Sequence, residues 1–149
     1  MHKSLLAFNT SLAEVNKTVL LQEVYYIAVC LKDSDQLIGE IFFIKEEPDT
    51  YSIGWNFNEK FHGKGYAKES AYAFIDFLFD VRGARRIYAY VENDNIASQK
   101  LCERLGFRKE GHFLEFISFI KNADGTPRYE DTMQYAILKR EWIANKVSN

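Results

Sequence analysis

The hydrophobic period of the sequence changes at one short segment, His62-Gly63-Lys64-Gly65-Tyr66-Ala67. Before this segment, apolar residues alternate with small or polar ones, which is the period-two pattern of a half-buried strand. These apolar residues are Tyr51, Ile53, Trp55 and Phe57. After the segment, the apolar residues recur at helical spacing, at Ala67, Ala71, Phe74, Ile75 and Leu78. The chain therefore has to turn from a strand into an amphipathic helix through a loop with two glycines.

This loop has the features of an anion site. Gly63 and Gly65 let the backbone turn so that its N–H groups converge at a helix N-terminus, where the helix dipole favours phosphate and Lys64 adds positive charge. An ordinary tight turn into a helix explains the same residues, so the loop alone leaves both interpretations open. Two nucleotide motifs are excluded, because Asn58 and Lys68 stand where a Walker A loop and a Rossmann fingerprint need glycine.

Length and composition limit the class of protein. A chain of 149 residues with 47% hydrophobic content predicts a single domain, residues 1–149, that buries its own core. The net charge of −2 argues against nucleic acid as a partner. Cys30 and Cys102 form no metal-type pair with a histidine, so we expect reduced thiols and no metal. The apolar run Val19–Leu31 is interrupted and too short to span a bilayer, and no leader precedes it. These observations predict that the protein has no membrane partner and is cytoplasmic.

Local signals predict the elements of the first half of the chain. A helix is expected to begin near Ser11, because Ser11–Glu14 has the form of a capping box. Aromatic and β-branched residues predict strands at Tyr25–Leu31 and Leu37–Ile44, joined by a polar turn. A second turn at Glu46–Asp49 leads into the strand that ends at Phe57.

The second half of the chain shows the same kinds of signal. A strand is expected at Arg86–Glu92, covered on both faces, with Tyr88 and Tyr90 on one of them. Asn93-Asp94-Asn95 is a cluster of capping residues before a second helix, which Gly106 ends as a left-handed cap. The apolar stripe of that helix is Ala97, Leu101 and Leu105. Strands at about Phe113–Ile120 and Thr132–Lys139 complete the prediction.

The element order β-β-β-α-β-α-β-β predicts an α+β fold. We expect a mixed, mostly antiparallel central sheet with helices on both faces. The connection from Phe57 to Ile87 is expected to be a right-handed β-α-β crossover between parallel strands.

Taken together, four groups of residues resemble one family, the GCN5-related N-acetyltransferases (GNAT), and within it the ribosomal-protein N-terminal acetyltransferase (RimJ/RimL-like) branch. The resemblance covers about Ser11 to Trp142. Its segments are Gly54–Glu69, Asn95–Ser98, Leu105–Gly111, and Tyr129–Asp131 with Tyr135–Leu138. In this family the glycine loop holds the pyrophosphate of acetyl-coenzyme A (acetyl-CoA), and the fold is of the α+β class expected above.

The resemblance implies which residues bind the cosubstrate. The pantetheine arm is expected to pair like an extra strand between Trp55–Phe57 and Arg86–Glu92. Lys60 stands where the family usually has Gln or Arg, so a charge is kept and bidentate geometry is lost. The implied acetyl-CoA-binding residues are Trp55, Asn56, Phe57, Lys60, His62, Gly63, Lys64, Gly65, Tyr66, Ala67, Asn93, Asn95 and Ser98.

The resemblance also implies a reaction, in which a primary amine attacks the acetyl thioester directly in a ternary complex. A backbone N–H near Asn56–Phe57 would stabilise the oxyanion, and Ser98 would protonate the thiolate. Cys102 stands where many members have a tyrosine acid. Glu40, on a predicted strand, is a candidate base if burial raises its pKa.

Each of these assignments has a plainer alternative. Asn95 also fits a helix cap, Ser98 a hydroxyl bonded to the preceding turn, and Cys102 a small core residue. Glu40 also fits a solvated position on an edge strand. Tyr88 and Tyr90 fit sheet packing better than catalysis.

One departure from the family concerns the beginning of the chain. Members normally have about one strand and one helix before the region that matches Ser11, and only ten residues precede it here. We therefore expect that strand and helix to be missing, with either a shortened reading frame or a more open acceptor site.

The predicted function is N-acetylation of a primary amine, either a protein N-terminal α-amino group or a small amine. The alternatives are a polyamine or antibiotic acetyltransferase, for which the acidic turn Glu46–Asp49 could attract a cation, and a catalytically weak acetyl-CoA-binding or oligomerisation module. A homodimer is the protein partner we expect.

Overall fold

The computed structural model describes residues 9–13 and 23–148, and for residues 9–13 it describes the backbone alone. The chain forms two compact units, residues 1–87 and 88–149, which are described in turn. Among the residues described, no helix is long and apolar enough to cross a membrane.

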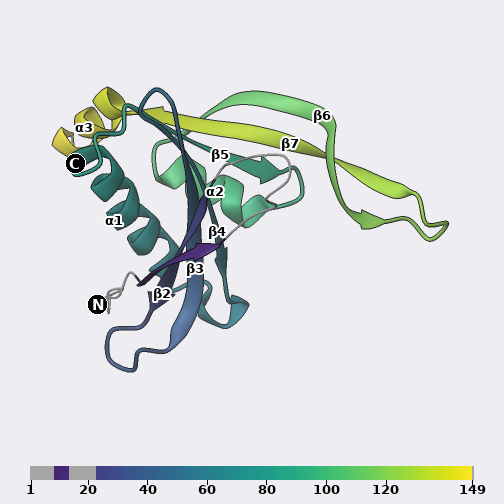
Figure 1. Ribbon diagram of the computed structural model, residues 1–149, viewed down its shortest axis with the longest axis horizontal. Helices are drawn as coiled ribbons and strands as arrows, with labels where there is room; N and C mark the ends of the chain where they lie inside the picture. The colour runs from purple at the N-terminus through teal and green to yellow at the C-terminus, as the bar shows by residue number, and fades with distance from the viewer. Residues whose placement is uncertain (1–8, 14–22, 149) are drawn as a thin grey trace. The chain divides into compact units, whose positions relative to one another are not determined.

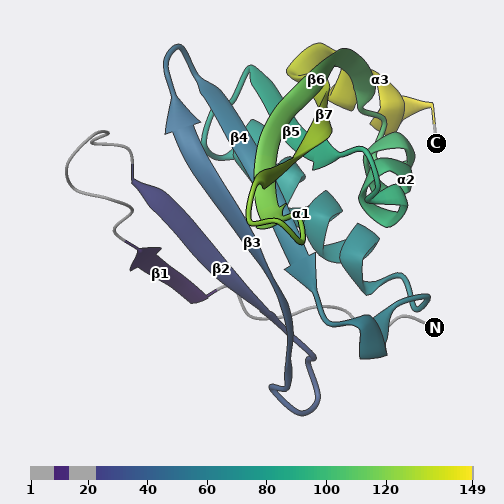
Figure 2. The same cartoon turned by 90° about the vertical axis from the view of Figure 1, so that its right-hand side faces the viewer.

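The first unit is an antiparallel sheet followed by a helix (Figures 1 and 2). Its strands run in the order β1 (Asn9–Ala13), β2 (Val24–Cys30), β3 (Leu37–Glu46) and β4 (Thr50–Phe57). A short 3-10 helix, η1 (Glu59–Phe61), leads to α1 (Tyr66–Asp80). Strands β2, β3, β4 and helix α1 lie close to the ranges predicted from the hydrophobic period.

Helix α1 buries the stripe that the sequence predicts. Ala71, Phe74, Ile75 and Leu78 are all buried, and the Phe74 ring lies 5.1 Å, centroid to centroid, from the Phe43 ring of β3. Phe43 also stacks on Tyr25 of β2 at 5.2 Å. These rings join the helix to the inner face of the strands that precede it.

The second unit contains β5 (Arg86–Glu92), which begins at the end of the first unit, then α2 (Ile96–Arg104), β6 (Arg108–Lys121), β7 (Pro127–Leu138) and α3 (Lys139–Val147). The strand order is β5-β7-β6. Strands β6 and β7 are antiparallel and form a long two-stranded ribbon (Figure 1). Three shifts in the pairing register make this ribbon irregular, one between Lys109 and Gly111 and one on either side of Ile117.

The helix predicted near Ser11 is wrong where the structure describes it. Residues Asn9–Ala13 form strand β1, in which Ser11 lies opposite Tyr26 of β2. Pairing along the edge of the sheet therefore overrides the local capping pattern. The remainder of the predicted helix, residues 14–22, lies outside the described residues.

The second unit also differs from the prediction at several positions. Tyr90 is 45% exposed, so β5 is not covered on both faces. Ala97 is exposed in the first turn of α2, and the buried stripe is Leu101, Cys102 and Leu105 instead. Strands β6 and β7 begin at Arg108 and Pro127, earlier than predicted, because their polar segments pair across the ribbon.

The predicted end of the last strand is wrong as well. Lys139 begins α3, whose N-cap is Leu138 rather than a Ser, Thr, Asp or Asn that would have marked the helix start. Glu141 closes its first turn by accepting the Leu138 N–H at 2.9 Å. The single-domain organisation stays a prediction.

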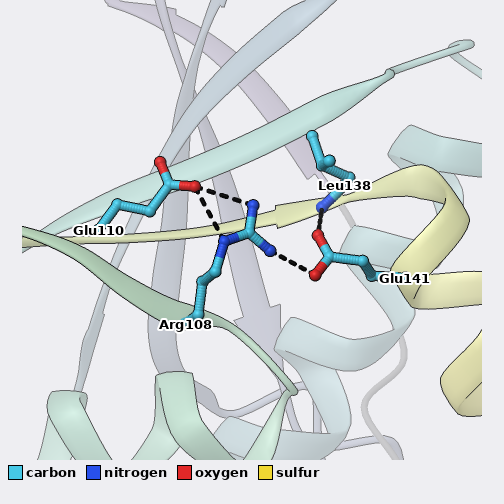
Figure 3. A network of polar contacts seen from close by, with 4 residues as sticks. All are labelled: Arg108, Glu110, Leu138 and Glu141. Atoms are coloured by element: carbon cyan, nitrogen blue, oxygen red, sulfur yellow. Dashed lines mark hydrogen bonds and ion pairs between the residues drawn. The ribbon is translucent and has the colours of Figure 1, made fainter.

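A polar network joins both strands of the ribbon to α3 (Figure 3). The Arg108 guanidinium donates to Glu110 at 3.0 and 2.8 Å and forms an ion pair with Glu141. The hydrogen bond from Arg108 is the main reason why the pKa of Glu141 lies below its usual value of 4.5. The ionised carboxylate thus stabilises the fold.

We expect Glu141→Gln to lower the free energy of unfolding at neutral pH by about 1 kcal/mol or less, since these side chains are partly exposed. Glutamine keeps an acceptor for the Leu138 N–H and loses the charge. Because the folded-state pKa is depressed, the difference from wild type should be full above about pH 4.5 and shrink as the pH falls further. Urea unfolding from about pH 7 to about pH 3 measures it.

Glu47→Gln, in the exposed turn before β4, is the matched control and should change stability less. A Glu141→Gln protein whose deficit stays constant down to about pH 3 would contradict the role assigned to the carboxylate.

Candidate functional site

The loop between β4 and α1 is anchored to the sheet at its start. The Asn58 N–H donates to the carbonyl of Ile38 in β3 at 2.8 Å, and Asn58 Oδ1 accepts the Lys60 N–H at 3.0 Å, which caps η1. His62 Nε2 lies 3.3 Å from the Phe57 carbonyl oxygen. The glycines that follow therefore start from a fixed point at the end of β4.

Gly63 and Gly65 both have the positive φ that the sequence predicts for this turn, +79° and +81°. Gly65 is the N-cap of α1 and supplies no side-chain hydrogen bond. The hydrogen bond from the Glu69 N–H to the Gly65 carbonyl, at 3.0 Å, starts the helical ladder. The amides of residues 66–68 precede it, so they point out of the helix end without an intrahelical acceptor.

Three side chains that can donate hydrogen bonds precede this helix end in the chain. Lys60, His62 and Lys64 are exposed, and Lys64 Nζ lies 6.0 Å from the centroid of the Phe61 ring. The ammonium group thus lies over the face of this ring, at the outer limit of a cation–π contact. N–H groups at a helix N-terminus together with lysines fit a phosphate or pyrophosphate group.

Glu69 is the acidic residue of the first turn of α1. Its Oε2 atom is buried and has no hydrogen-bond donor in the described part of the chain. A carboxylate at this position complements the helix dipole.

Glu40 and Asn56 face each other across β3 and β4. They are partners in the register, and Asn56 Nδ2 donates to Glu40 Oε1 at 3.2 Å. Glu40 is half-buried and Asn56 is exposed, so the carboxylate is held at the solvent-facing end of these strands rather than in the core.

The packing role of two glycines in the same strands was not predicted from the sequence. Gly39 lies opposite Phe57 and Gly54 lies opposite Phe42, and a Cβ atom at either glycine would come closer than 3.0 Å to the phenylalanine ring across from it. Each glycine therefore makes room for an aromatic ring on the neighbouring strand. The close approach of Phe57 to Gly39 positions the strand end from which the glycine loop starts.

In the second unit, Asn95 is confirmed as the N-cap of α2. Its Oδ1 atom accepts the Ser98 N–H at 3.1 Å, and Ser98 is half-buried in the first turn. The Asn93 carbonyl accepts a hydrogen bond from Gln99 Nε2 at 2.9 Å, and the Asn93 N–H donates to the Asp131 carbonyl at 3.0 Å. Gln99, which the sequence analysis did not single out, thus fixes the turn before the helix.

Cys102 lies one turn after Ser98 on α2 and is completely buried. Burial raises the pKa of its thiol to about 12. Both properties are those of a small core residue. Within residues 9–13 and 23–148, both cysteines are free and no three His, Cys, Asp or Glu side chains form a group that could hold a metal ion.

Comparison with known proteins places this geometry in a family. Residues 5–108 match the family model of the acetyltransferase (GNAT) domain. YnaD, an uncharacterised N-acetyltransferase of Bacillus subtilis (strain 168), is 39% identical over 115 residues, which are 76% of this chain and 64% of YnaD. The crystal structure of a GNAT-family acetyltransferase from Bacillus anthracis superimposes with a TM-score of 0.70 at 35% identity, over 78% of this chain and 67% of that one.

A spermidine N-acetyltransferase from Vibrio cholerae, solved in complex with CoA and spermine, has the same fold, with a TM-score of 0.70 at 24% identity over 80% of this chain and 68% of that one. The chain belongs to the GNAT acetyltransferase family. It spans 64% of the length of YnaD. The predicted mixed α+β fold is confirmed.

Proposed function

We propose that the protein is an N-acetyltransferase that transfers the acetyl group of acetyl-CoA to a primary amine. The observation that carries this proposal is the open N-terminus of α1, reached through two glycines with positive φ, in a chain of the GNAT family. Acetyl-CoA supplies an activated thioester, and the diphosphate of its nucleotide end is the anion for which this loop has the right donors.

The proposed binding residues follow the anchored loop. The N–H groups of residues 63–67 would hold the pyrophosphate, and Lys60, His62 and Lys64 would add donors around it. A lysine at position 60 neutralises a phosphate as a point charge, without the planar fork of an arginine. Trp55, Asn56 and Phe57 would bind the pantetheine arm, which Asn93 and Asn95 would orient.

The proposed catalytic groups have separate tasks. Ser98 would give a proton to the departing thiolate, and its helix position is set by the Asn95 cap. A backbone N–H near Phe57 would stabilise the oxyanion. Glu40, held by Asn56, would accept the proton of the attacking amine. We assign Cys102 to the core, because a buried thiol with a pKa of about 12 donates protons poorly.

Asn95 and Ser98 support the RimJ/RimL-like branch, and with it a protein N-terminal α-amino group or a small amine as acceptor. A polyamine is the competing acceptor, since the V. cholerae enzyme of this fold was solved with spermine. Turnover of a panel of peptides, polyamines and aminoglycosides, followed by detection of free CoA thiol, distinguishes these acceptors. The cytoplasmic location stays a prediction.

We expect Gly63→Ala to weaken binding of acetyl-CoA, because an alanine at φ +79° is strained and its methyl group narrows the approach to the loop amides. Saturating acetyl-CoA at about a hundred times its Kd should stabilise the wild-type fold by roughly 2.7 kcal/mol. The variant should lose most of that stabilisation, measured as the rise in Tm on adding acetyl-CoA.

Gly83→Ala is the matched control. Gly83 also has a positive φ, +72°, and a Cβ atom at either glycine meets nothing within 4 Å, so the strain is the same while the control lies after α1. Gly83→Ala should keep the full response to acetyl-CoA. An equal response in all three proteins would remove the glycine loop from the binding site.

We expect Ser98→Ala to lower kcat by about 10²- to 10⁴-fold with the best acceptor of the panel, the range of general acid catalysis. The KM for acetyl-CoA should change little, because the Asn95 cap uses the backbone N–H of residue 98 and alanine keeps it. Steady-state kinetics, with acetyl-CoA and the acceptor varied in turn, measure kcat and the KM for acetyl-CoA.

Ser98→Thr keeps a hydroxyl at the same position and should recover part of kcat, while Cys102→Ala should change stability more than kcat. Wild-type kcat in Ser98→Ala would refute the assigned role. A protein that is stabilised by acetyl-CoA but acetylates no amine in the panel would be a binding module.

A further inference from the structure

Four aromatic side chains of β5 and β6 form a cluster across β7, the strand between them. The Tyr90 ring of β5 lies 5.7 Å from the Phe116 ring and 6.4 Å from the Phe113 ring of β6, centroid to centroid. Phe113 and Phe116 lie 5.1 Å apart, and Tyr88 meets Tyr90 edge to face at 5.5 Å. We call these four residues the aromatic cluster. Tyr90, Phe113 and Phe116 are 37% to 50% exposed, so the cluster is open to solvent.

A bend in β6 sets Phe113 and Phe116 side by side. Glu115, between them, has a positive φ of +47°, which is unfavourable for a residue other than glycine unless its neighbours hold it. Its N–H donates to Asp131 Oδ1 of β7 at 2.9 Å, and Asp131 Oδ2 lies 3.1 Å from His112 Nε2. The hydrogen bond from the Glu115 amide is the main reason why the pKa of Asp131 lies below its usual value of 3.8. The ionised carboxylate therefore holds the bend and, through it, the two rings.

The cluster lies at the end of β5 from which the chain continues to the proposed catalytic serine. Strand β5 ends two residues after Tyr90, at Glu92. The Asn93 N–H that follows donates to the Asp131 carbonyl of β7 at 3.0 Å. Helix α2 begins three residues after Asn93 and has Ser98 in its first turn. A molecule bound over the rings is therefore at the same end of β5 as Ser98.

A buried hydroxyl lies on the same face as the rings. Thr132 of β7 is opposite Phe113 in the register, and partners in an antiparallel pair share one face of the sheet. Thr132 is 2% exposed, and among the residues described its hydroxyl has no hydrogen-bond partner. A buried hydroxyl without a partner costs free energy until a partner reaches it. A ligand with N–H donors that enters between the rings would supply one.

On β5 and β7, the charged side chains next to the cluster on this face are acidic. Side chains two residues apart on a strand share a face, which places Glu92 beside Tyr90 and Glu130 beside Thr132. The Glu130 side chain is only 16% exposed, and the mostly exposed Arg128 reaches it at 3.9 Å. This distance is too long for a hydrogen bond, so the carboxylate of Glu130 can still accept one from a ligand.

Ring faces, carboxylates and a buried oxygen together match an alkylammonium group. Its charge is attracted to the faces of aromatic rings, and its apolar stem packs on the same rings. An anion would be repelled by Glu92 and Glu130. An uncharged hydrocarbon would leave the Thr132 hydroxyl without a donor.

We propose that the aromatic cluster binds a second alkylammonium group of a small amine acceptor, so that acceptors with two basic nitrogens are preferred over monoamines. One nitrogen attacks the thioester as the neutral amine, and the other remains charged over the rings. The role in acceptor choice rests on the proposed acetyl transfer. Binding of an alkylammonium ion to the cluster does not depend on it.

Binding is tested without acetyl-CoA, through the amide resonances of isotope-labelled protein at about pH 7. Protonated n-butylamine should shift the amides of residues 88–92 and 113–116, and n-butanol, an uncharged molecule with the same chain, should bind more weakly. Tyr90→Leu keeps an apolar side chain and loses the ring face, so it should raise the Kd of n-butylamine roughly two- to fivefold. Glu130→Gln keeps the size and loses the charge, and it should raise this Kd by a similar factor.

Tyr129→Leu and Glu103→Gln are the matched controls. Tyr129 is an exposed tyrosine of β7, on the face away from Thr132, and Glu103 is an exposed glutamate of α2. Both variants should bind n-butylamine as wild type does. Circular dichroism checks that all four variants fold.

Turnover tests the role in acceptor choice. With saturating acetyl-CoA, kcat/KM should be roughly fivefold or more higher for putrescine, a diamine, than for n-butylamine. This exceeds the twofold advantage that two equivalent amino groups explain. The preference should shrink in Tyr90→Leu and Glu130→Gln because the KM for putrescine rises, while kcat for n-butylamine should change little.

Equal Kd values for n-butylamine and n-butanol, unmoved amides in the cluster, or wild-type binding in both Tyr90→Leu and Glu130→Gln would overturn the cation site. A preference for putrescine that is absent in wild type, or that survives in both variants, would overturn its role in acceptor choice. A protein that binds n-butylamine at the cluster and acetylates no amine would support the cation site and contradict the proposed acetyl transfer.

Discussion

Burial of one face of α1 against the strands before it fixes the position of the glycine loop. Phe74, Ile75 and Leu78 are almost completely buried, and each contributes about 1.5 to 3 kcal/mol relative to an exposed side chain. The contact between Phe74 and Phe43 joins the helix to β3, and Asn58 joins the start of the loop to the same strand. Residues 58–66 are therefore held at both ends, so the free amides of α1 have a defined direction.

The second unit is held together by a different kind of contact. Its core residues Leu101, Cys102 and Tyr135 are buried, while the Arg108 network fixes the ends of β6 and β7 to α3. The outer half of the ribbon, residues 113–129, contains no buried residue. This contrast explains why the same two strands are well packed at one end and exposed at the other.

Signals within one or two turns of the sequence predicted the caps, the glycine turns and the amphipathic helix. The glycines at 63 and 65, the Asn95 cap and the stripe of α1 were predictable because each depends on residues within one or two turns. The helix at Ser11 was predicted wrongly, because its capping pattern competes with pairing to β2. The packing role of Gly39 and Gly54 was not predicted. Each makes room for an aromatic ring on the opposite strand, and the register between two strands cannot be read from the sequence of one of them.

The candidate site also has residues that the sequence predicts and residues that depend on tertiary structure. Donors that belong to one loop, from Lys60 to Ala67, follow from the sequence. The partners of Glu40 and Asn93 do not, since Asn56 and Gln99 reach them through strand register and a turn. Burial of Cys102 likewise depends on tertiary packing, although its helical position was apparent from the sequence.

We propose that the amides at the start of α1 bind the pyrophosphate of acetyl-CoA. A titration of isotope-labelled protein with acetyl-CoA, followed through the backbone amide resonances, tests it most directly. We expect the amides of residues 63–67 to shift strongly and to saturate with one equivalent, while those of Glu47 and Asp49, in the turn at the opposite end of β4, remain unchanged. Saturable binding that leaves the amides of residues 63–67 unmoved would contradict it.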